Sequence, residues 1–425
     1  MKLIRYTLLL WLALGNLQAQ TPGYDHAYAR QMLDTLASPA LLGRGYYKNA
    51  DEKAANIIAT EFVKLGVQPF TTNNYYQTFK FPVNIFPGPM EVKLDGAALK
   101  PGAEYIVSAT CPTYKGEGKV LVCDSITINN PKKLKKFLSK KYSKVFLLFN
   151  LKGTEDKEVL KKLNAIIAGN HLEALGVIEV KEKLTWDIAM EVGKFPSLQI
   201  ISSAVKAYPK SINLDIESRF IEEYTGRNVM GYVKGTVRPD SFIVFTAHYD
   251  HLGIMGHDAI FTGANDNASG SAMLLSLAKY YTKNPSKYSI AFIAFGGEEL
   301  GLLGSFHYVK KPAFPLGKIK FLTNLDILGT GDEGITVVNG SVFKPQFDTL
   351  VAINTKLGLL KEVKIRGKAA NSDHYPFTEK GVPAFFIYTM GGIKAYHDVF
   401  DRRETLPMTE FPRLFTLLTE FVKTF

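Results

Sequence analysis

The sequence predicts an α/β fold in which an open, mostly parallel sheet is flanked by helices and carries a smaller inserted α/β unit. Two observations lead to this class. After residue 225 the chain contains long apolar runs, such as 242–247 and 288–295, which are typical of buried parallel strands. Helical segments, notably 268–283, separate several of these runs, and alternation of strand and helix indicates a mostly parallel sheet.

The elements before residue 88 are two helices and a strand. "DHAYARQMLDTLAS" and "NADEKAANIIATEFVKLG" carry apolar residues at helical spacing, and the second ends on Gly66. "YYQTFKFPVNIF" alternates as a strand does and stops at "PGP". From 88 to 210, short apolar runs alternate with lysine-rich helical stretches. We therefore expect one large domain from residues 20–87 and 211–425, with residues 88–210 as the inserted unit.

The first residues have the layout of a secretory signal peptide. Lys2 and Arg5 precede an apolar stretch at 6–14, and a short polar tail ends in Ala19. We expect residues 1–19 to be removed and the protein to be exported, either periplasmic or extracellular. The alternative is an uncleaved membrane anchor, but the stretch is too short for a comfortable span, so no stable membrane insertion is expected.

Charge and cysteine content exclude other classes of protein and site. The formal net charge of +11 is scattered, with one local concentration at 129–144. We interpret this concentration as the solvated face of a lysine-rich helix and expect no nucleic-acid partner. Cys111 and Cys123 are too few for a cysteine metal site. In an exported protein they could form a disulfide, which the sequence does not decide.

Metal-capable side chains stand where the predicted apolar strands end. The carboxyl ends of strands in an open α/β sheet meet at one crevice, which is where such folds place their sites. The residues are His248 and Asp250 after "FIVFTA", Asp266 in "GANDNASG" before a helix, Glu298 and Glu299 after "IAFIAFGG", Asp326 after "FLTNL", and His397 after "AFFIYTM".

Two histidines and three carboxylates are too few for two separate zinc ions with three protein ligands each. If Asp266 bridges, one ion takes Asp266, Glu299 and His397, and the other takes Asp266, His248 and Asp326. Each ion keeps an open position, as catalytic zinc requires. Two ions roughly 3.5–4 Å apart would polarise a carbonyl and acidify a shared water.

This arrangement gives the adjacent acids Glu298 and Glu299 different roles. Neighbouring residues in a tight turn point in different directions, so we assign Glu299 as a ligand and Glu298 as general base and then acid. Asp250, two residues after His248 on an extended chain, can orient the imidazole of that histidine.

Five motifs occur in the order found in one known family, and together they resemble the zinc aminopeptidases of family M28. They are "AHYDHLG", "GANDNASG", "GGEELGLLGS", "NLDILG" and "YHDVFD". The resemblance covers about 24–85 and 225–425. It implies a phosphorylase/hydrolase-like zinc peptidase fold, with a protease-associated-like domain at 88–210. "GAND" stands where many members have "GADD", which leaves Asp266 intact.

By the same resemblance, His248, Asp266, Glu299, Asp326 and His397 are the metal ligands and Glu298 is the base. Tyr396 occupies a position that in relatives stabilises the oxyanion. The expected protein is a secreted di-zinc metallopeptidase, an aminopeptidase that acts on peptides with a free N-terminus. Its oligomeric state stays open.

Two other functions are compatible with this fold. One is a glutaminyl cyclase-like zinc transferase, which uses a similar ligand set with one zinc. The other is a non-catalytic binding protein, although such relatives typically lose ligands or the base, and this chain retains all six residues. Further residues carry weaker expectations: His251 and His257 as loop residues rather than ligands, Asp258 as support for the bridging loop, Phe385 and Phe386 as core, and Asp373 and His374 as either cleft contacts or structural residues.

Overall fold

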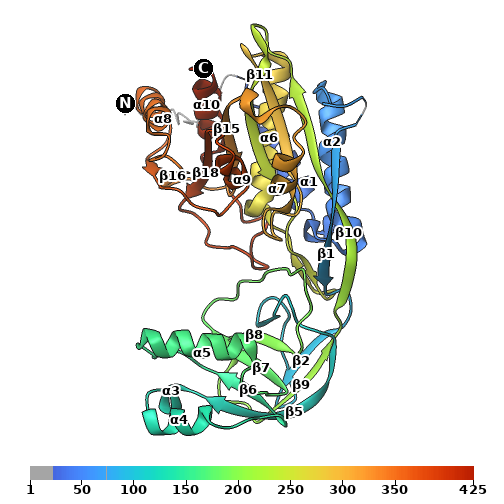
Figure 1. Cartoon of the computed structure of the whole chain (residues 1–425), viewed down its shortest axis with the longest axis vertical. Helices are drawn as coiled ribbons and strands as arrows, with labels where there is room; N and C mark the ends of the chain where they lie inside the picture. The colour runs from blue at the N-terminus through green and yellow to red at the C-terminus, as the bar shows by residue number, and fades with distance from the viewer. Residues whose placement is uncertain (1–22, 73) are drawn as a thin grey trace, which may run out of the picture.

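The computed structural model describes residues 23–72 and 74–425, which contain two eight-stranded sheets joined by one long antiparallel strand pair (Figure 1). That pair is β1 (Tyr76–Ile85) with β10 (Arg219–Val233). We call the segment between these strands, residues 86–218, the second unit, and the remainder the large unit. The expected signal peptide, residues 1–19, lies outside the described residues. Among the described residues, none of the helices has the length and apolarity needed to cross a bilayer.

The large unit is built on an eight-stranded sheet whose central strands are parallel, which confirms the predicted fold class. Antiparallel strands flank this centre on both sides. In spatial order the strands are β1, β10, β14 (Tyr288–Phe295), β11 (Arg238–His248), β15 (Ile319–Leu325), β18 (Ala384–Met390), β16 (Gly334–Val338) and β17 (Val363–Ile365).

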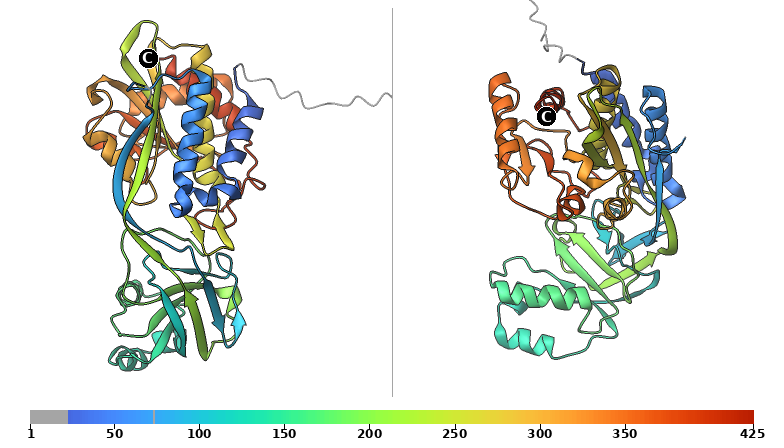
Figure 2. Two further views of the ribbon diagram at one scale, coloured as in Figure 1. Left: turned by 90° about the vertical axis from the view of Figure 1, so that its right-hand side faces the viewer. Right: turned by 45° about the horizontal axis from the view of Figure 1, so that its top comes forward.

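Both faces of the central strands are covered, which explains their nearly continuous apolar sequence. On β11, Ile243 and Phe245 point into one core, whereas Phe242 and Val244 point into the other. The first face carries α1 (His26–Leu36), α2 (Ala50–Leu65), α6 (Gly270–Lys283), α8 (Lys344–Leu357) and α10 (Phe411–Val422), of which α1, α2 and α6 lie side by side in Figure 2. The second face carries α7 (Leu303–Lys310) and α9 (His374–Glu379).

Local sequence sets the ends of the first two helices. The side chain of Asp25 accepts a hydrogen bond from the N–H of Tyr28 and so caps α1. Gly66, with φ of 78°, ends α2 in the left-handed conformation that glycine adopts without steric cost. Both ends agree with the helices expected from the sequence.

The second unit has its own eight-stranded mixed sheet. In spatial order its strands are β3 (Ala97–Ala98), β2 (Met90–Leu94), β9 (Ser211–Ile216), β5 (Tyr114–Cys123), β6 (Val145–Phe149), β7 (Gly176–Lys181), β8 (Ser197–Ile201) and β4 (Tyr105–Val107), with helices α3 (Ser125–Ile128), α4 (Pro131–Leu138) and α5 (Lys157–Gly169). Because β9 pairs with β2 and β5, this sheet continues past residue 210. In α4 only Phe137 is buried, and its lysines face solvent. Cys111 and Cys123 are buried free thiols.

The two units are connected by β1 and β10 and also share an apolar core. The hairpin of β12 (Gly253–Met255) and β13 (Ala259–Phe261) extends from the large unit into the core of the second unit. The rings of Phe261 and Trp186 lie with centroids 4.5 Å apart. This packing holds the second unit against the loops at the carboxyl ends of the central strands.

Candidate metal centre

The expected metal-capable residues meet at one edge of the large sheet. Parallel pairing of β11 with β14 and β15 brings the ends of these strands together. All of the side chains are buried or nearly so: His248 ends β11, Asp266 lies in the turn before α6, Glu298 and Glu299 follow β14, Asp326 follows β15, and His397 lies in the loop after β18.

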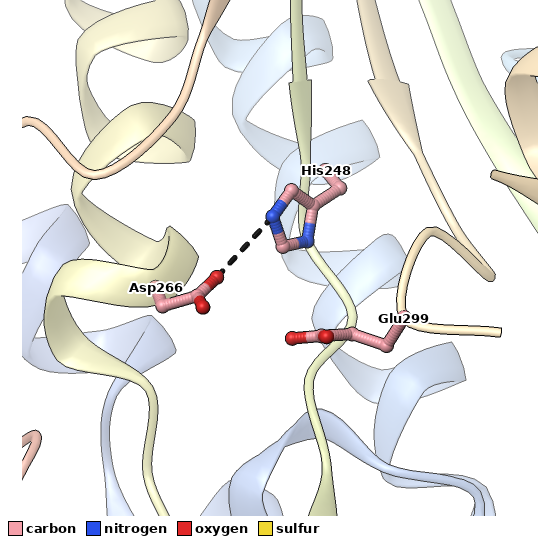
Figure 3. A group of neighbouring side chains, drawn as sticks. All are labelled: His248, Asp266 and Glu299. Carbon is pink, nitrogen blue, oxygen red and sulfur yellow. Dashed lines mark ion pairs between the residues drawn. The ribbon is translucent and has the colours of Figure 1, made fainter. Parts of the chain in front are cut away.

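The carboxylate of Asp266 stands between two histidine rings that come from different loops. Its Oδ1 is 3.3 Å from Nε2 of His248, and its Oδ2 is 3.2 Å from Nε2 of His397. Figure 3 shows His248 and Asp266 facing each other, with the carboxylate of Glu299 directed toward the same space. One carboxylate that offers one oxygen to each of two imidazoles has the geometry of a bridging ligand.

The remaining contacts complete two sets of ligand atoms. Nε2 of His397 is 3.1 Å from Oε2 of Glu299, and Nε2 of His248 is 3.4 Å from Oδ1 of Asp326. If Asp266 were shared, these contacts would make up the two triads expected from the sequence. Oε2 of Glu298 is farther from His248, at 4.0 Å.

A longer distance limit between ligand atoms groups the same residues differently. Ligand atoms lie within 4.8 Å of one another in the sets His248, Asp266 and Glu299, and His248, Glu298 and Asp326. Both sets use His248, yet its Nε2 has one lone pair and can bind one ion. We therefore favour the division given by the closer contacts, in which each histidine serves its own triad.

The donor set fits zinc on the chain's own chemistry. Imidazole and carboxylate are ordinary zinc ligands. Asp326 accepts a hydrogen bond from the Ser372 hydroxyl at Oδ2 (2.9 Å), but its buried Oδ1 has no hydrogen-bond partner among the described residues. A buried carboxylate oxygen without a donor is costly, and a cation at this position would satisfy it.

The loop that carries Asp266 is held by a residue to which the sequence analysis gave no role. Asp401 is fully buried, and its two carboxylate oxygens accept the N–H groups of Asn265 (2.8 Å) and Asp266 (2.9 Å). The sequence suggests Asp258 for this support, but the hydrogen bonds to the loop come from Asp401. Asp401 is the last residue of the motif "YHDVFD", so a sequence signal for it exists.

Arg44 braces the same loop from the opposite end of the sequence. Its side chain is fully buried, and burial lowers its pKa to about 10. Within the described part of the chain, the guanidinium donates to five backbone carbonyls, those of Tyr249 (2.6 Å), Thr262 (2.7 Å), Gly263 (2.8 Å), Leu36 (2.9 Å) and Asp266 (3.3 Å). Sequence reasoning missed this residue, although it lies in the early stretch that resembles family M28.

The second unit contributes to the orientation of His397. Nδ1 of His397 donates to the carbonyl oxygen of Trp186 (2.9 Å) and lies 3.2 Å from Oδ1 of Asp187. The N–H of Trp186 in turn donates to the carbonyl of His397 at 2.8 Å. These partners fix the ring so that Nε2 faces the centre.

Asp250 lies beside His248, but its carboxylate is not the nearest partner of the ring. Nδ1 of His248 is 3.2 Å from the carbonyl oxygen of Asp250 and 3.8 Å from its Oδ1. The carboxylate instead accepts the N–H of Glu298 (3.2 Å) and the hydroxyl of Tyr46 (3.0 Å). Asp250 therefore positions both His248 and the backbone of Glu298.

His251 is also part of the centre, although we expected only a loop position for it. It is fully buried, and its Nδ1 donates to Oε1 of Glu299 at 2.6 Å. This bond leaves Oε2 of Glu299 facing His397. His257, by contrast, is exposed.

The two adjacent glutamates have opposite electrostatic environments. Burial raises the pKa of Glu298 well above its usual range, and the charge of Glu299 acts in the same direction. For Glu299, burial also favours the neutral form, but His397 and His251 outweigh it and lower the pKa to about 2. Divergent pKa values in a carboxylate pair are the pattern seen where one acid transfers protons and the other stays ionised.

A cavity of about 230 Å³ opens onto the centre. Its wall consists of the six residues expected as ligands and base together with Ile327, Arg366, Asn371, Phe386, Tyr388 and Tyr396. The ring of Tyr396, 44% exposed, stacks on His397 with centroids 4.1 Å apart.

The weaker expectations near this cavity have mixed outcomes. Phe385 is core, as expected, but Phe386 also lines the cavity. Asp373 and His374 are fully buried and do not line it.

The part of the chain that builds this centre matches a known protein family. Residues 228–422 match the model described as peptidase family M28. This part of the chain belongs to family M28. We call residues 228–422 the M28 segment. All six residues expected as ligands and base lie within it.

Curated relatives are similar to the M28 segment. An aminopeptidase of Bacillus subtilis, YwaD, is 34% identical over 173 residues, 39% of this chain and 36% of the relative. Leupeptin-inactivating enzyme 1 of Streptomyces exfoliatus is 33% identical over 155 residues, 36% of this chain and 33% of the relative. The matched segment thus spans about a third of the length of each relative.

Solved structures share the fold of both units. A zinc aminopeptidase from Bacillus subtilis matches with a TM-score of 0.68 and 22% identity, over 94% of this chain and 95% of that one. A peptidase M28 precursor from Shewanella amazonensis matches with a TM-score of 0.70 and 17% identity, over 95% and 93%. Because each match covers nearly the whole of both chains, the overall fold described here recurs in solved proteins.

Proposed function

We propose that this protein is an exported zinc aminopeptidase that holds two zinc ions bridged by Asp266. One ion would be held by Asp266, Glu299 and His397, and the other by Asp266, His248 and Asp326. The observation that carries the proposal is the placement of the two Asp266 oxygens 3.3 Å and 3.2 Å from the Nε2 atoms of two different histidines. The relatives named aminopeptidase and zinc metalloprotease support the choice of metal and of reaction.

Glu298 performs the proton transfers. When bound, zinc would polarise the scissile carbonyl and lower the pKa of the attacking water. Glu298 takes the proton from that water and returns it to the leaving amine. Its carboxylate lies in the cavity wall beside both triads, and its backbone N–H is held by Asp250. A general base must lie within hydrogen-bond distance of the proton that it removes. The hydrogen bond from the N–H of Glu298 to Asp250 holds the backbone that carries this carboxylate.

Tyr396 stabilises the negative charge that develops on the carbonyl oxygen. Tyr396 belongs to the cavity wall, and stacking on His397 keeps its ring beside the centre. A preorganised donor of this kind acts more strongly on the developing oxyanion than on the neutral carbonyl.

The substrate class is peptides with a free N-terminus. Four carboxylates line the cavity, and one of them, Glu298, is left outside the two triads. Because neither zinc ion would be bound to Glu298, its carboxylate is the local negative charge that can face the α-ammonium group of a peptide. The second unit, whose Trp186 and Asp187 contact His397, serves as a protease-associated-like domain that completes one side of the site.

The decisive experiment combines a metal count with a Glu298→Gln variant. The wild-type protein should bind two zinc ions per chain and release free amino acids from peptides. Glu298→Gln should keep both ions but lose about 10²–10⁴-fold in kcat, because the general base is gone while the ligands remain. The matched variant Glu404→Gln, which changes an exposed glutamate, should keep both properties.

Three results would contradict the proposal. Near-normal turnover of Glu298→Gln would remove this residue from the mechanism. One zinc per chain, with cyclisation of N-terminal glutamine instead of release of amino acids, would indicate a glutaminyl cyclase. Absence of hydrolysis across a broad peptide panel with zinc supplied would indicate a binding protein.

A further inference from the structure

Among the described residues that line the cavity at the candidate metal centre, Arg366 is the only arginine or lysine. Its guanidinium Nη1 donates to the hydroxyl of Tyr388, another wall residue, at 3.1 Å. Among the described residues, no carboxylate forms an ion pair with Arg366, although most other arginines in that part of the chain have one. A guanidinium with a neutral partner keeps most of its donors free for a ligand.

The backbone places this side chain securely. Arg366 directly follows β17, where its N–H donates to the carbonyl of Val337 (3.0 Å) and its carbonyl accepts from the N–H of Ser341 (3.3 Å). Tyr388 lies on β18, which pairs with β16, and β16 pairs with β17. Tyr388 therefore belongs to the sheet, and the exposed residue Arg366 is held next to the edge strand of that sheet by two backbone hydrogen bonds.

Charge balance makes this cation significant. Two zinc ions would neutralise the four carboxylates of the centre, Asp266, Glu298, Glu299 and Asp326. The guanidinium would then be the uncompensated charge of the cavity. A fixed cation beside a substrate pocket favours substrates that carry an anion, and arginine matches the planar geometry of a carboxylate.

We infer that Arg366, supported by Tyr388, forms a carboxylate-binding subsite, so that the preferred substrates carry a carboxylate close to their N-terminal residue. The inference rests on the aminopeptidase function proposed above. Two groups offer this chemistry: the side chain of an N-terminal glutamate or aspartate, and the C-terminal carboxylate of a very short peptide. The apolar wall residues Phe386 and Ile327 suit the aliphatic part of either group.

Isosteric substrate pairs test the subsite and distinguish its two sources. Glutamyl and glutaminyl p-nitroanilides differ by one charge at nearly equal shape. Leucyl-glycine and leucyl-glycinamide differ in the same way at the C-terminus. We expect wild-type kcat/KM to favour the charged member of one pair by about 10-fold, the scale of one partly solvated charge-assisted bond. The pair that shows the preference identifies the source.

Two variants assign the preference to the residue. Arg366→Gln should abolish the preference for the charged member. Lys368→Gln should leave it intact, because Lys368 is two residues away, bonds to Glu379 at 2.6 Å and does not line the cavity. A wild-type ratio near one for both pairs, or a preference that survives in Arg366→Gln, would overturn the inference.

A binding measurement separates this inference from the aminopeptidase proposal. Calorimetry with zinc-loaded wild-type protein should show tighter binding of free glutamate than of glutamine, or of acetate than of acetamide if the C-terminal group is the ligand. The difference should vanish in Arg366→Gln. If no peptide is hydrolysed but this difference is present, the function proposal fails and the subsite stands. If hydrolysis occurs without either preference, the subsite fails alone.

Discussion

Asp401 offers the sharpest test of how the chain builds its bridging ligand. The replacement Asp401→Asn keeps the size of the side chain but removes its charge and turns one acceptor oxygen into a donor. In the structure both oxygens accept backbone N–H groups, from Asn265 at 2.8 Å and Asp266 at 2.9 Å, and the side chain is fully buried. One amide oxygen can replace only one of these bonds, and the NH₂ group then faces an N–H.

The expected cost follows from these contacts. A hydrogen bond to a charged group contributes about 1.5–3 kcal/mol, so the loss of one bond should lower the free energy of unfolding of the metal-free protein by about that amount. Because Asp266 would no longer be held between the two histidines, zinc affinity should also fall, by about 10–100-fold, as is typical when a residue that orients a ligand is replaced.

Urea unfolding of the metal-free protein and zinc competition with a chromophoric chelator measure the two effects. Asp95→Asn is a matched control, since Asp95 also accepts backbone N–H groups, from Lys210 and Ser211, but is exposed in the second unit. This control should leave zinc affinity unchanged. An Asp401→Asn protein that binds two zinc ions as tightly as wild type would refute the role of Asp401.

Two further predictions concern pH and the oxyanion. Burial raises the pKa of Asp51 to about 7, so the folded state binds the proton of this carboxyl group more tightly than the unfolded state does. The free energy of unfolding should therefore fall as pH rises from about 4 to 7, by up to about 4 kcal/mol. Urea unfolding of Asp51→Asn should lack this loss, so the variant gains on wild type toward pH 8; parallel pH profiles would contradict the assignment. Tyr396→Phe should lower kcat by about 10²-fold with KM and zinc content nearly unchanged, because stacking on His397 persists while the donor is removed. Steady-state kinetics with metal analysis measures this, and an unaltered kcat would exclude Tyr396 as the oxyanion donor.

Much of the fold was predictable because its signals are local. The apolar runs of β11, β14, β15 and β18 follow from burial on both faces, and the glycine after α2 follows from the conformation that it must adopt. The parallel centre of the sheet was likewise confirmed. The continuation of the second sheet through β9 was not foreseen, because a strand that starts just after a turn carries no sign of the sheet that it will join.

The roles of Arg44 and Asp401, which hold the loop of Asp266, could not be predicted for a different reason. Arg44 bonds to carbonyls more than 200 residues away, and Asp401 bonds to N–H groups about 135 residues before it. Both residues lie in stretches that resemble the family, but their partners are backbone atoms, which every residue possesses, so the residue types alone do not show what they contact. His251 was similarly undervalued, because its contact with Glu299 depends on how two loops approach each other.

The sequence by itself determined which segments become buried strands and which acids and histidines stand at their ends, because periodicity and residue chemistry are properties of neighbouring residues. Only the tertiary structure decided that the two oxygens of Asp266 face different histidines, that the second unit holds the ring of His397, and that Arg366 lies in the cavity wall. Such facts depend on the direction in which each side chain points, and that direction is set by packing between segments far apart in the chain.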